Sequence, residues 1–380
     1  MLETIRQHDT IARIDIARDT GFSPATVTAI TAELMTLGMI EPTESGTLTS
    51  DQKRGRPRSA LKLRADAFIV AGVKVGSQII TVVLSDFVGN AIGHYDHPLS
   101  ASPQSADLLC QDVSEALSQA TSQFDLTLED IAGAALGLAG YVDGKVGFVH
   151  WSSSLTERSV DMQSELARVV SCPVFIENDV NLVAKAEQLF GLGKTHQSFL
   201  VVTIEHGIGL GIVINGALHR GARGCGAELG HVKMVPNGAL CQCGQKGCLE
   251  AYAGEYALVA RANHGSTYDI PDFEEFQDAI AQNEPSAINA LVQAQEYFAI
   301  GLANLVNLFD PERIIVASKV GASHPLCQPR VLEQINEMVV QVDKPMPEIV
   351  IHGWGDLMWA HGAAAHALEE VAALKLRERE

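Results

Sequence analysis

The 380 residues carry a net charge of −19, are 47% hydrophobic and include 33 glycines, a composition typical of a globular protein with two or three domains. This composition excludes a chain that is disordered throughout, and no apolar stretch reaches the ~18 residues that a membrane span needs. The first residues lack the basic and apolar regions of a secretory signal, so we expect a cytoplasmic protein with no membrane partner.

The charge is distributed unevenly along the chain. Residues 1–64 contain nine Lys or Arg and eight Asp or Glu, so the remaining residues carry a net charge of −20. Residues 53–64 hold six basic side chains and no acidic one. A basic segment at one end of an acidic chain predicts two parts with different partners.

Residues 1–64 have the pattern of a helix–turn–helix. A short helix is expected from Leu2 and a second one at residues 11–17, followed by Gly21 at the turn between helices. Ser23 and Pro24 then suit the N-cap and the first position of a third helix. The apolar stripe of this third helix consists of Val27, Ile30, Leu34 and Leu37. Residues 40–63 are expected to form a wing and a linker.

The opposite face of the third helix is small and almost uncharged. If this helix enters the major groove of DNA, the contacting residues are Ser23, Ala25, Thr28 and Ala29. The basic segment adds Arg54, Arg56 and Arg58, which suit insertion into a narrow, A·T-rich minor groove. An ordinary helical hairpin and a solvated linker are the alternatives. Because the two features are adjacent and precede an acidic body, they favour DNA binding.

Residues 65–380 alternate between strand and helix patterns, which is typical of an α/β architecture. The expected strands are residues 67–75, 78–84, 131–138, 174–176 and 198–204. The expected helices are residues 104–122, 179–190, 286–308 and 356–375. Strand–turn–strand patterns begin near residues 69 and 199, which predicts two similar lobes.

The strongest local pattern is a cluster of metal-binding residue types. Cys241, Cys243 and Cys248 lie within eight residues of one another, and His231 lies ten residues upstream. Zinc prefers tetrahedral sulfur and nitrogen ligands, and the glycines at 244 and 247 allow a short loop to surround one ion. Four protein ligands leave no open position, so the predicted zinc site is structural. The alternative is a chance cluster of free thiols.

Polar residues near this cluster form a second candidate site. Asn178 and Asp179 stand where a strand is expected to end and a helix to begin, while Glu228 and Glu250 bracket the cysteines. An asparagine with several carboxylates can fix the hydroxyl groups of a sugar. A helix N-cap is the alternative role for Asp179. For the glycine series at residues 207–211, a structural hairpin and a phosphate-binding loop are both possible.

Together these motifs resemble those of the ROK family of repressors, uncharacterised reading frames and sugar kinases, in particular its glucose-, N-acetylglucosamine- and xylose-responsive repressors. The resemblance covers essentially the whole chain and rests on residues 55–57, 177–181, 228–231, 241–250 and 307–311. It implies a winged helix–turn–helix followed by a two-lobed, actin-like sugar-kinase fold with a structural zinc loop. The implied limits are 1–64 for the DNA-binding domain, 65–190 plus 361–380 for the first lobe, and 191–360 for the second lobe with a dimer surface.

The resemblance also implies a sugar in the cleft between the lobes, held by Asn178, Asp179, Glu228, His231 and Glu250. His231 would bind zinc through one ring nitrogen and a sugar hydroxyl through the other. In the kinases of the family, the residue that matches Asp179 is the general base. Residues 74–77, 205–207 and 317–319 depart from the kinase pattern, all on the nucleotide side. Lys74 stands where the kinases have an aspartate that organises Mg²⁺ and phosphate, so we expect no kinase activity.

The sequence therefore predicts a cytoplasmic, zinc-containing transcriptional repressor of carbohydrate metabolism genes that binds operator DNA as a homodimer or tetramer. Its effector would be a sugar or a sugar phosphate. One alternative is a ROK-type sugar kinase with ATP-dependent hexose phosphorylation, in which Asp179 would be the catalytic base. The other alternative is a DNA-bound scaffold that is controlled by a sugar-transport phosphocarrier protein.

Overall fold

The computed structural model describes residues 1–43, 60–266, 268–353 and 355–378, and the chain forms two compact units. Unit 1 comprises Met1–Asp179, Leu189–Thr195 and Trp359–Glu380. Unit 2 comprises Val180–Gln188 and His196–Met358. The first 64 residues thus belong to the same compact unit as the first α/β lobe. The three domain limits predicted from the sequence stay predictions.

Unit 1 begins with three helices and three short strands. These are α1 (Leu2–His8), β1 (Ile11–Ala12), α2 (Arg13–Thr20), α3 (Pro24–Thr36), β2 (Ile40–Pro42) and β3 (Ala60–Leu63). The strands form an antiparallel sheet in the order β1-β3-β2. The helix predicted at residues 11–17 begins only at Arg13, because Ile11 and Ala12 pair with β3.

Helix α3 has the predicted start, and two residues of its predicted apolar stripe are buried, whereas Ile30 and Leu37 are half-buried. The Ser23 hydroxyl accepts a hydrogen bond from the backbone N–H of Thr26 at 3.1 Å, as an N-cap does. Val27 and Leu34 are fully buried. Thr31 is also buried, and its hydroxyl accepts a hydrogen bond from Nε of Arg13 at 3.0 Å. This bond connects α2 to α3.

The rest of unit 1 is built around a five-stranded sheet with the order β11-β7-β4-β5-β6. Its strands are β4 (Ile69–Val75), β5 (Ile79–Ser85), β6 (Ala91–Pro98), β7 (Ile131–Leu138) and β11 (Val174–Asn178). Strands β4, β5 and β6 are antiparallel neighbours, whereas β7 and β11 run parallel to β4. A smaller antiparallel sheet contains β8 (Gly140–Asp143), β9 (Phe148–Ser152) and β10 (Val160–Asp161). The helices are α4 (Ala106–Gln123), α5 (Met162–Leu166) and α12 (Met358–Arg377).

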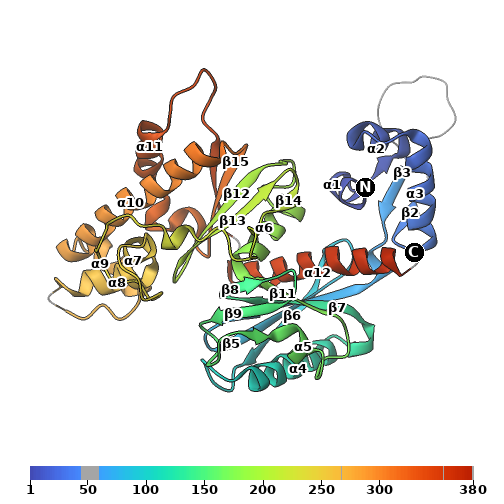
Figure 1. Ribbon diagram of the computed structural model, residues 1–380, viewed down its shortest axis with the longest axis horizontal. Helices are drawn as coiled ribbons and strands as arrows, with labels where there is room; N and C mark the ends of the chain where they lie inside the picture. The colour runs from blue at the N-terminus through green and yellow to red at the C-terminus, as the bar shows by residue number, and fades with distance from the viewer. Residues whose placement is uncertain (44–59, 267, 354, 379–380) are drawn as a thin grey trace. The chain divides into compact units, whose positions relative to one another are not determined.

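Helices cover both faces of the five-stranded sheet (Figure 1). Leu109 and Val113 of α4 share an apolar core with Val73 of β4. On the other face, α12 lies directly against β4 at Gly72. A Cβ atom at Gly72 would lie 2.1 Å from the carbonyl oxygen of Ala360, so a larger residue would push α12 away. Glycine at this strand position therefore allows the C-terminal helix to lie directly on the first sheet.

Unit 2 contains a second five-stranded sheet, with the order β14-β13-β12-β15-β16. Its strands are β12 (Phe199–Ile204), β13 (Ile208–Ile214), β14 (Ala217–Leu218), β15 (Arg313–Ser318) and β16 (Glu348–Gly353). Its helices include α6 (Asp179–Leu189), α7 (Glu250–Ala253), α8 (Glu255–Asn263), α9 (Phe273–Ala281), α10 (Pro285–Phe309) and α11 (Pro329–Met338). As in unit 1, three successive antiparallel strands are followed by two parallel strands on the other side. This shared topology confirms the prediction of two similar lobes.

The glycine series at residues 207–211 belongs to a structural hairpin, one of its two predicted roles. Strand β13 pairs with β12 in antiparallel register over this stretch. A Cβ atom at Gly209 would lie 2.3 Å from Cγ2 of Val180, and one at Gly211 would lie 2.7 Å from Cβ of Ala184. The glycines therefore allow α6 to pack closely on the sheet.

Among the helices that the structure describes, none combines the length and hydropathy required to cross a membrane.

Arg6 of α1 connects the N-terminal segment to the turn after β5. Its guanidinium group donates hydrogen bonds to the carbonyl oxygens of Phe87 at 2.8 Å and Val88 at 2.6 Å. Arg6 is only 9% exposed, and burial lowers the pKa of its side chain to about 10, so the group stays charged at neutral pH. Next to it, the Gln7 side chain donates a hydrogen bond to the carbonyl oxygen of Lys194 at 2.9 Å.

We predict that Arg6→Met lowers the free energy of unfolding by about 2 kcal/mol, because hydrogen bonds from a charged donor contribute ~1.5–3 kcal/mol and the buried carbonyl of Phe87 and the half-buried carbonyl of Val88 would lose their partner. Urea denaturation monitored by circular dichroism measures the change. Arg18→Met is the matched control, since the Arg18 side chain is 70% exposed and its ion pairs are on the surface. Equal stability of the Arg6 variant and the wild type would contradict the prediction.

Candidate functional site

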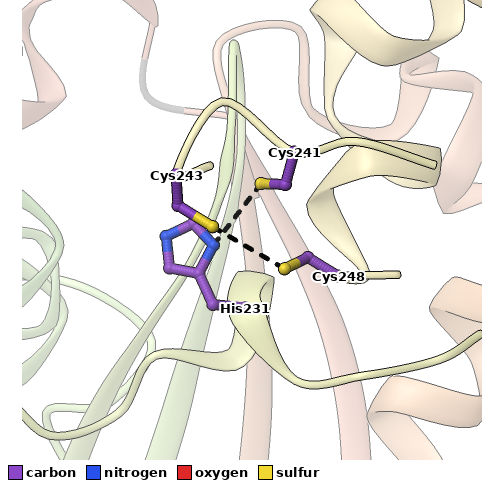
Figure 2. Close-up of side chains that lie close together, drawn as sticks. All are labelled: His231, Cys241, Cys243 and Cys248. Carbon is purple, nitrogen blue, oxygen red and sulfur yellow. Dashed lines mark hydrogen bonds between the residues drawn. The ribbon is translucent and has the colours of Figure 1, made fainter. Parts of the chain in front are cut away.

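The four predicted metal ligands come together in unit 2 (Figure 2). His231 ends a short 3₁₀ helix, and the three cysteines lie in the loop that precedes α7. One ligand atom from each of the four residues lies within 4.8 Å of the others. The Sγ atoms of Cys243 and Cys248 are 3.8 Å apart, and Nδ1 of His231 is 3.7 Å from Sγ of Cys241.

These distances fit a tetrahedral zinc ion. Zn–S bonds of about 2.3 Å and Zn–N bonds of about 2.0–2.1 Å place two sulfur ligands about 3.8 Å apart and a sulfur and a nitrogen about 3.6 Å apart. Burial raises the pKa of the Cys241 thiol to about 12. In the absence of metal this thiol is therefore protonated at neutral pH, and a zinc ion must displace the proton.

Backbone pairing between residues 232–235 and residues 247–249 closes the cysteine loop. The N–H of Leu249 donates to the carbonyl oxygen of Val232 at 2.9 Å, and the N–H of Met234 donates to that of Gly247 at 2.8 Å. Gly247 has a φ of +79°, and a Cβ atom there would lie 1.8 Å from the carbonyl oxygen of Val235. Only glycine fits at this position, so the close approach of the two segments depends on it.

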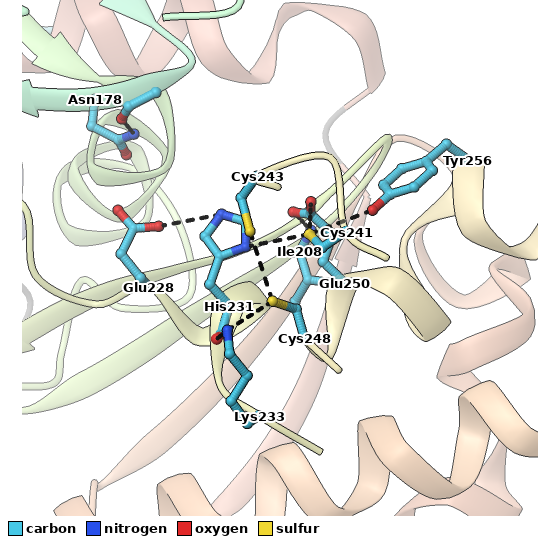
Figure 3. Close-up of polar contacts among 11 residues, drawn as sticks. Asn178, Ile208, Glu228, His231, Lys233, Cys241, Cys243, Cys248, Glu250 and Tyr256 are labelled. Atoms are coloured by element: carbon cyan, nitrogen blue, oxygen red, sulfur yellow. Dashed lines mark hydrogen bonds and ion pairs between the residues drawn. The ribbon is translucent and has the colours of Figure 1, made fainter. Parts of the chain in front are cut away.

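Of the five predicted sugar-binding residues, His231 belongs to the metal cluster, and Glu228 and Glu250 lie beside it (Figure 3). Oε2 of Glu228 is 3.9 Å from Nε2 of His231, the ring nitrogen opposite the one that faces Cys241. Oε1 of Glu250 is 3.6 Å from Sγ of Cys241, and its Oε2 accepts a hydrogen bond from the N–H of Ile208 at 3.3 Å. His231 thus faces a cysteine with one nitrogen and a carboxylate with the other.

The other two predicted sugar-binding residues belong to unit 1. Asn178 is the last residue of β11, and its side-chain amide donates a hydrogen bond to the carbonyl oxygen of Gly140 at 3.0 Å. The backbone N–H of Asn178 donates to Oε1 of Glu177, which is fully buried, at 2.9 Å. Asp179 follows as the first residue of α6. Both residues stand at the predicted strand–helix junction.

Sequence reasoning missed two contacts of the cysteines. The Tyr256 hydroxyl donates to Sγ of Cys241 at 3.7 Å, and burial raises the pKa of Tyr256 well above its usual range. The Lys233 ammonium group donates to Sγ of Cys248 at 3.0 Å. Lys233 lies only two residues after a predicted ligand, which was a usable signal, whereas the contact of Tyr256 depends on how α8 packs.

The segments that depart from the kinase pattern carry other interactions. The Lys74 ammonium group in unit 1 lies 3.7 Å from the centre of the Trp359 ring, a cation–π contact. In unit 2, Nζ of Lys319 is 2.6 Å from Oδ1 of Asp356, and this carboxylate raises the pKa of Lys319. Lys74 thus places a positive charge, rather than a metal-binding carboxylate, at the end of β4.

The four predicted DNA-contacting residues at the start of α3 are all exposed: Ser23, Ala25, Thr28 and Ala29. The Thr28 hydroxyl donates a hydrogen bond to the carbonyl oxygen of Pro24 at 2.8 Å, which leaves its methyl group on the helix surface. The predicted minor-groove residues Arg54, Arg56 and Arg58 lie outside the described residues.

The fold and the cluster define a protein of two topologically equivalent α/β lobes with a Cys₃His centre beside acidic residues. The ROK family pattern matches residues 70–370, and the chain belongs to the ROK family, as the sequence motifs predicted. Its architecture is the actin-like fold of that family.

Relatives with known names include regulators and kinases. The chain is 29% identical to the xylose repressor of Bacillus subtilis strain 168 over 328 residues, which are 86% of this chain and 83% of the repressor. It is 28% identical to the glucokinase of Streptomyces coelicolor over 318 residues, which are 79% of this chain and 98% of the kinase. The solved structure of a ROK family transcriptional regulator, a homologue of the E. coli MLC protein, matches with a TM-score of 0.78 and 25% identity, covering 97% of this chain and 95% of that chain.

We predict that Cys243→Ser abolishes tight zinc binding and lowers thermal stability, because a hydroxyl group is a poor zinc ligand and the loop would lose its central ion. Metal analysis after dialysis and a thermal melt with and without a chelator measure both effects. Cys172→Ser is the control, since Cys172 is half-buried in unit 1 and far from the cluster in sequence. Retention of stoichiometric zinc by the Cys243 variant would refute the assignment.

Proposed function

We propose that the chain is a sugar-responsive transcriptional repressor that binds operator DNA through residues 1–64 and lacks kinase activity. The observation that carries this proposal is the extent of the match to the ROK family regulator. That match covers 97% of this chain, so the unmatched remainder is far shorter than residues 1–64. The glucokinase match spans nearly the whole kinase but only 79% of this chain. Most of the N-terminal segment is therefore shared with a regulator.

The N-terminal segment supports a winged helix–turn–helix. Helices α2 and α3 follow each other across Gly21, and the sheet of β1, β2 and β3 completes the module. The start of α3 presents small, exposed side chains, which suit a close approach to base edges in the major groove. Arg54, Arg56 and Arg58 would add contacts in the minor groove. A homodimer or tetramer would then bind two half-sites of a palindromic operator.

The effector in this proposal is a sugar or sugar phosphate held by Asn178, Asp179, Glu228, His231 and Glu250. The arrangement of His231 supports this role, because zinc bound at Nδ1 would orient Nε2 toward a ligand hydroxyl beside Glu228. The ion itself would be structural and would supply only rigidity to the loop. Lys74 supports the absence of kinase activity. It stands where the kinases of the family have an aspartate that organises Mg²⁺, and its ammonium group contacts Trp359 instead.

In this proposal the sugar and the operator oppose each other. The sugar would favour an arrangement of the lobes in which the DNA-binding segments no longer match the operator spacing. By linkage, the operator would weaken sugar binding by the same factor. The hydrogen bonds of Arg6 and Gln7 to the first lobe provide a physical connection for this coupling, because they hold α1 against the lobe.

A thermal-shift screen with a panel of hexoses, pentoses, N-acetyl sugars and sugar phosphates, each with and without Mg-ATP, tests the function. We expect one class of sugar to raise the melting temperature independently of ATP, since a ligand at ~100 times its Kd stabilises the native state by about 2.7 kcal/mol. Consumption of ATP would establish the kinase instead. If no sugar shifts the melting temperature but a phosphocarrier protein releases bound operator, the protein-controlled scaffold would replace the sugar-responsive repressor.

We predict that Thr28→Glu weakens operator binding at least ~10-fold, because the new carboxylate would face phosphates and base acceptors at the start of the recognition helix. Thr36→Glu is the matched control. Thr36 is exposed at the other end of α3, its hydroxyl bonds the helix backbone in the same way, and the change in charge is identical. Fluorescence anisotropy on operator DNA selected by the wild type measures both variants. Equal weakening would show that net charge, not position, determines the effect.

A further inference from the structure

Lys233 occupies a defined position beside the metal cluster. Its ammonium group lies 3.0 Å from Sγ of Cys248 and 3.0 Å from the carbonyl oxygen of His231 (Figure 3). The side chain therefore bridges the backbone of one candidate ligand and the sulfur of another. This contact follows from the backbone register, because Lys233 and Cys248 form an antiparallel bridge.

The charge around the cluster requires a cation. A zinc ion bound by three thiolates and one neutral imidazole carries one net negative charge. Glu250 lies 3.6 Å from Sγ of Cys241, and Glu228 lies 3.9 Å from the His231 ring, so both carboxylates add negative charge nearby. Like charges at these distances repel one another, and a positive group in contact with a thiolate offsets the repulsion.

We propose that Lys233 is a positioning residue of the metal centre: its ammonium group holds the Cys248 thiolate in its ligating position and neutralises the excess charge of the zinc site. The inference rests on the proposed zinc binding. Charge-assisted hydrogen bonds to a ligand atom are stronger than neutral ones, and outer-shell partners of metal ligands typically change metal affinity by ~10–100-fold. Lys233 therefore protects the zinc loop from loss of its ion.

The test compares full-length variants loaded with zinc. Excess chromogenic chelator removes the zinc, which gives the rate of zinc release. Competition with the same chelator gives the Kd of the protein for zinc, and both are measured in the absence of sugar and DNA. We expect Lys233→Met to weaken zinc binding about 10-fold. Lys246→Met is the matched control, because Lys246 is exposed in the same loop and the variant loses the same charge. Lys233→Arg, which keeps the charge, should rescue most of the affinity.

A spectroscopic measurement distinguishes a hydrogen bond from Lys233 to the Cys248 sulfur from a general stabilisation of the fold. In the cobalt-substituted protein, loss of a donor to Cys248 should shift the thiolate-to-cobalt charge-transfer band to longer wavelength, because the donor lowers the energy of the sulfur lone pairs. Lys233→Gln keeps a neutral donor, so it should retain part of the band position and is the second variant if the methionine variant fails to fold. The difference from wild type should shrink at high salt, since Lys233 is an exposed residue.

Three results would overturn the role of Lys233. The first is zinc release at the wild-type rate from Lys233→Met with an unchanged cobalt spectrum. The second is equal weakening in Lys233→Met and Lys246→Met, which would indicate net charge alone. The third is a wild-type chain that retains no zinc, which would remove the metal centre as well. Failure of sugar or operator binding would instead refute the repressor and leave these metal measurements unaffected.

Discussion

The backbone pairing of residues 232–235 with residues 247–249 is the constraint on which the site in unit 2 depends. It brings His231 to the cysteines, and it requires glycine at 247 because any side chain there would collide with Val235. The same register sets Lys233 opposite Cys248. A zinc ion would hold this loop with four strong bonds, and the two carboxylates beside it would gain a rigid support. A bound zinc ion, the acidic residues and the lysine would therefore act as one local unit.

Close approaches at glycines determine how helices cover the two sheets. Gly72 allows α12 to lie on β4, and Gly209 and Gly211 allow α6 to lie on β13. Helix α12 comes from the far end of the chain, whereas α6 is separated from β13 only by β12. The glycines at residues 209 and 211, for which a phosphate-binding loop was one possible role, thus serve helix packing.

Much of the fold followed from local patterns. The five strands and four helices predicted for residues 65–380 lie close to their predicted ranges, because alternating and helical periodicities persist in buried elements. The metal set was also predictable, since its four ligands are close in sequence. Strand β1 was taken for helix, and strands β6, β8, β9, β10, β14, β15 and β16 were missed, because a strand's conformation depends on the strand it pairs with. The contact of Tyr256 was also missed, since the packing of α8 brings it to Cys241.

Residue types at short spacing were sufficient for the family and for the Cys₃His cluster, whereas the bound zinc and the loss of nucleotide binding stay predictions. These conclusions rest on side chains that are close in sequence. Residues joined by a short loop must also lie close together in space, so their spacing alone predicts the cluster. The partners of two charged groups, Arg6 and Lys74, were decided by packing between distant segments. Arg6 bonds the turn at Phe87, and Lys74 lies over Trp359, although no pattern in the chain connects these pairs. Long-range contacts of this kind arise when sheets and helices assemble, so only the folded chain reveals them.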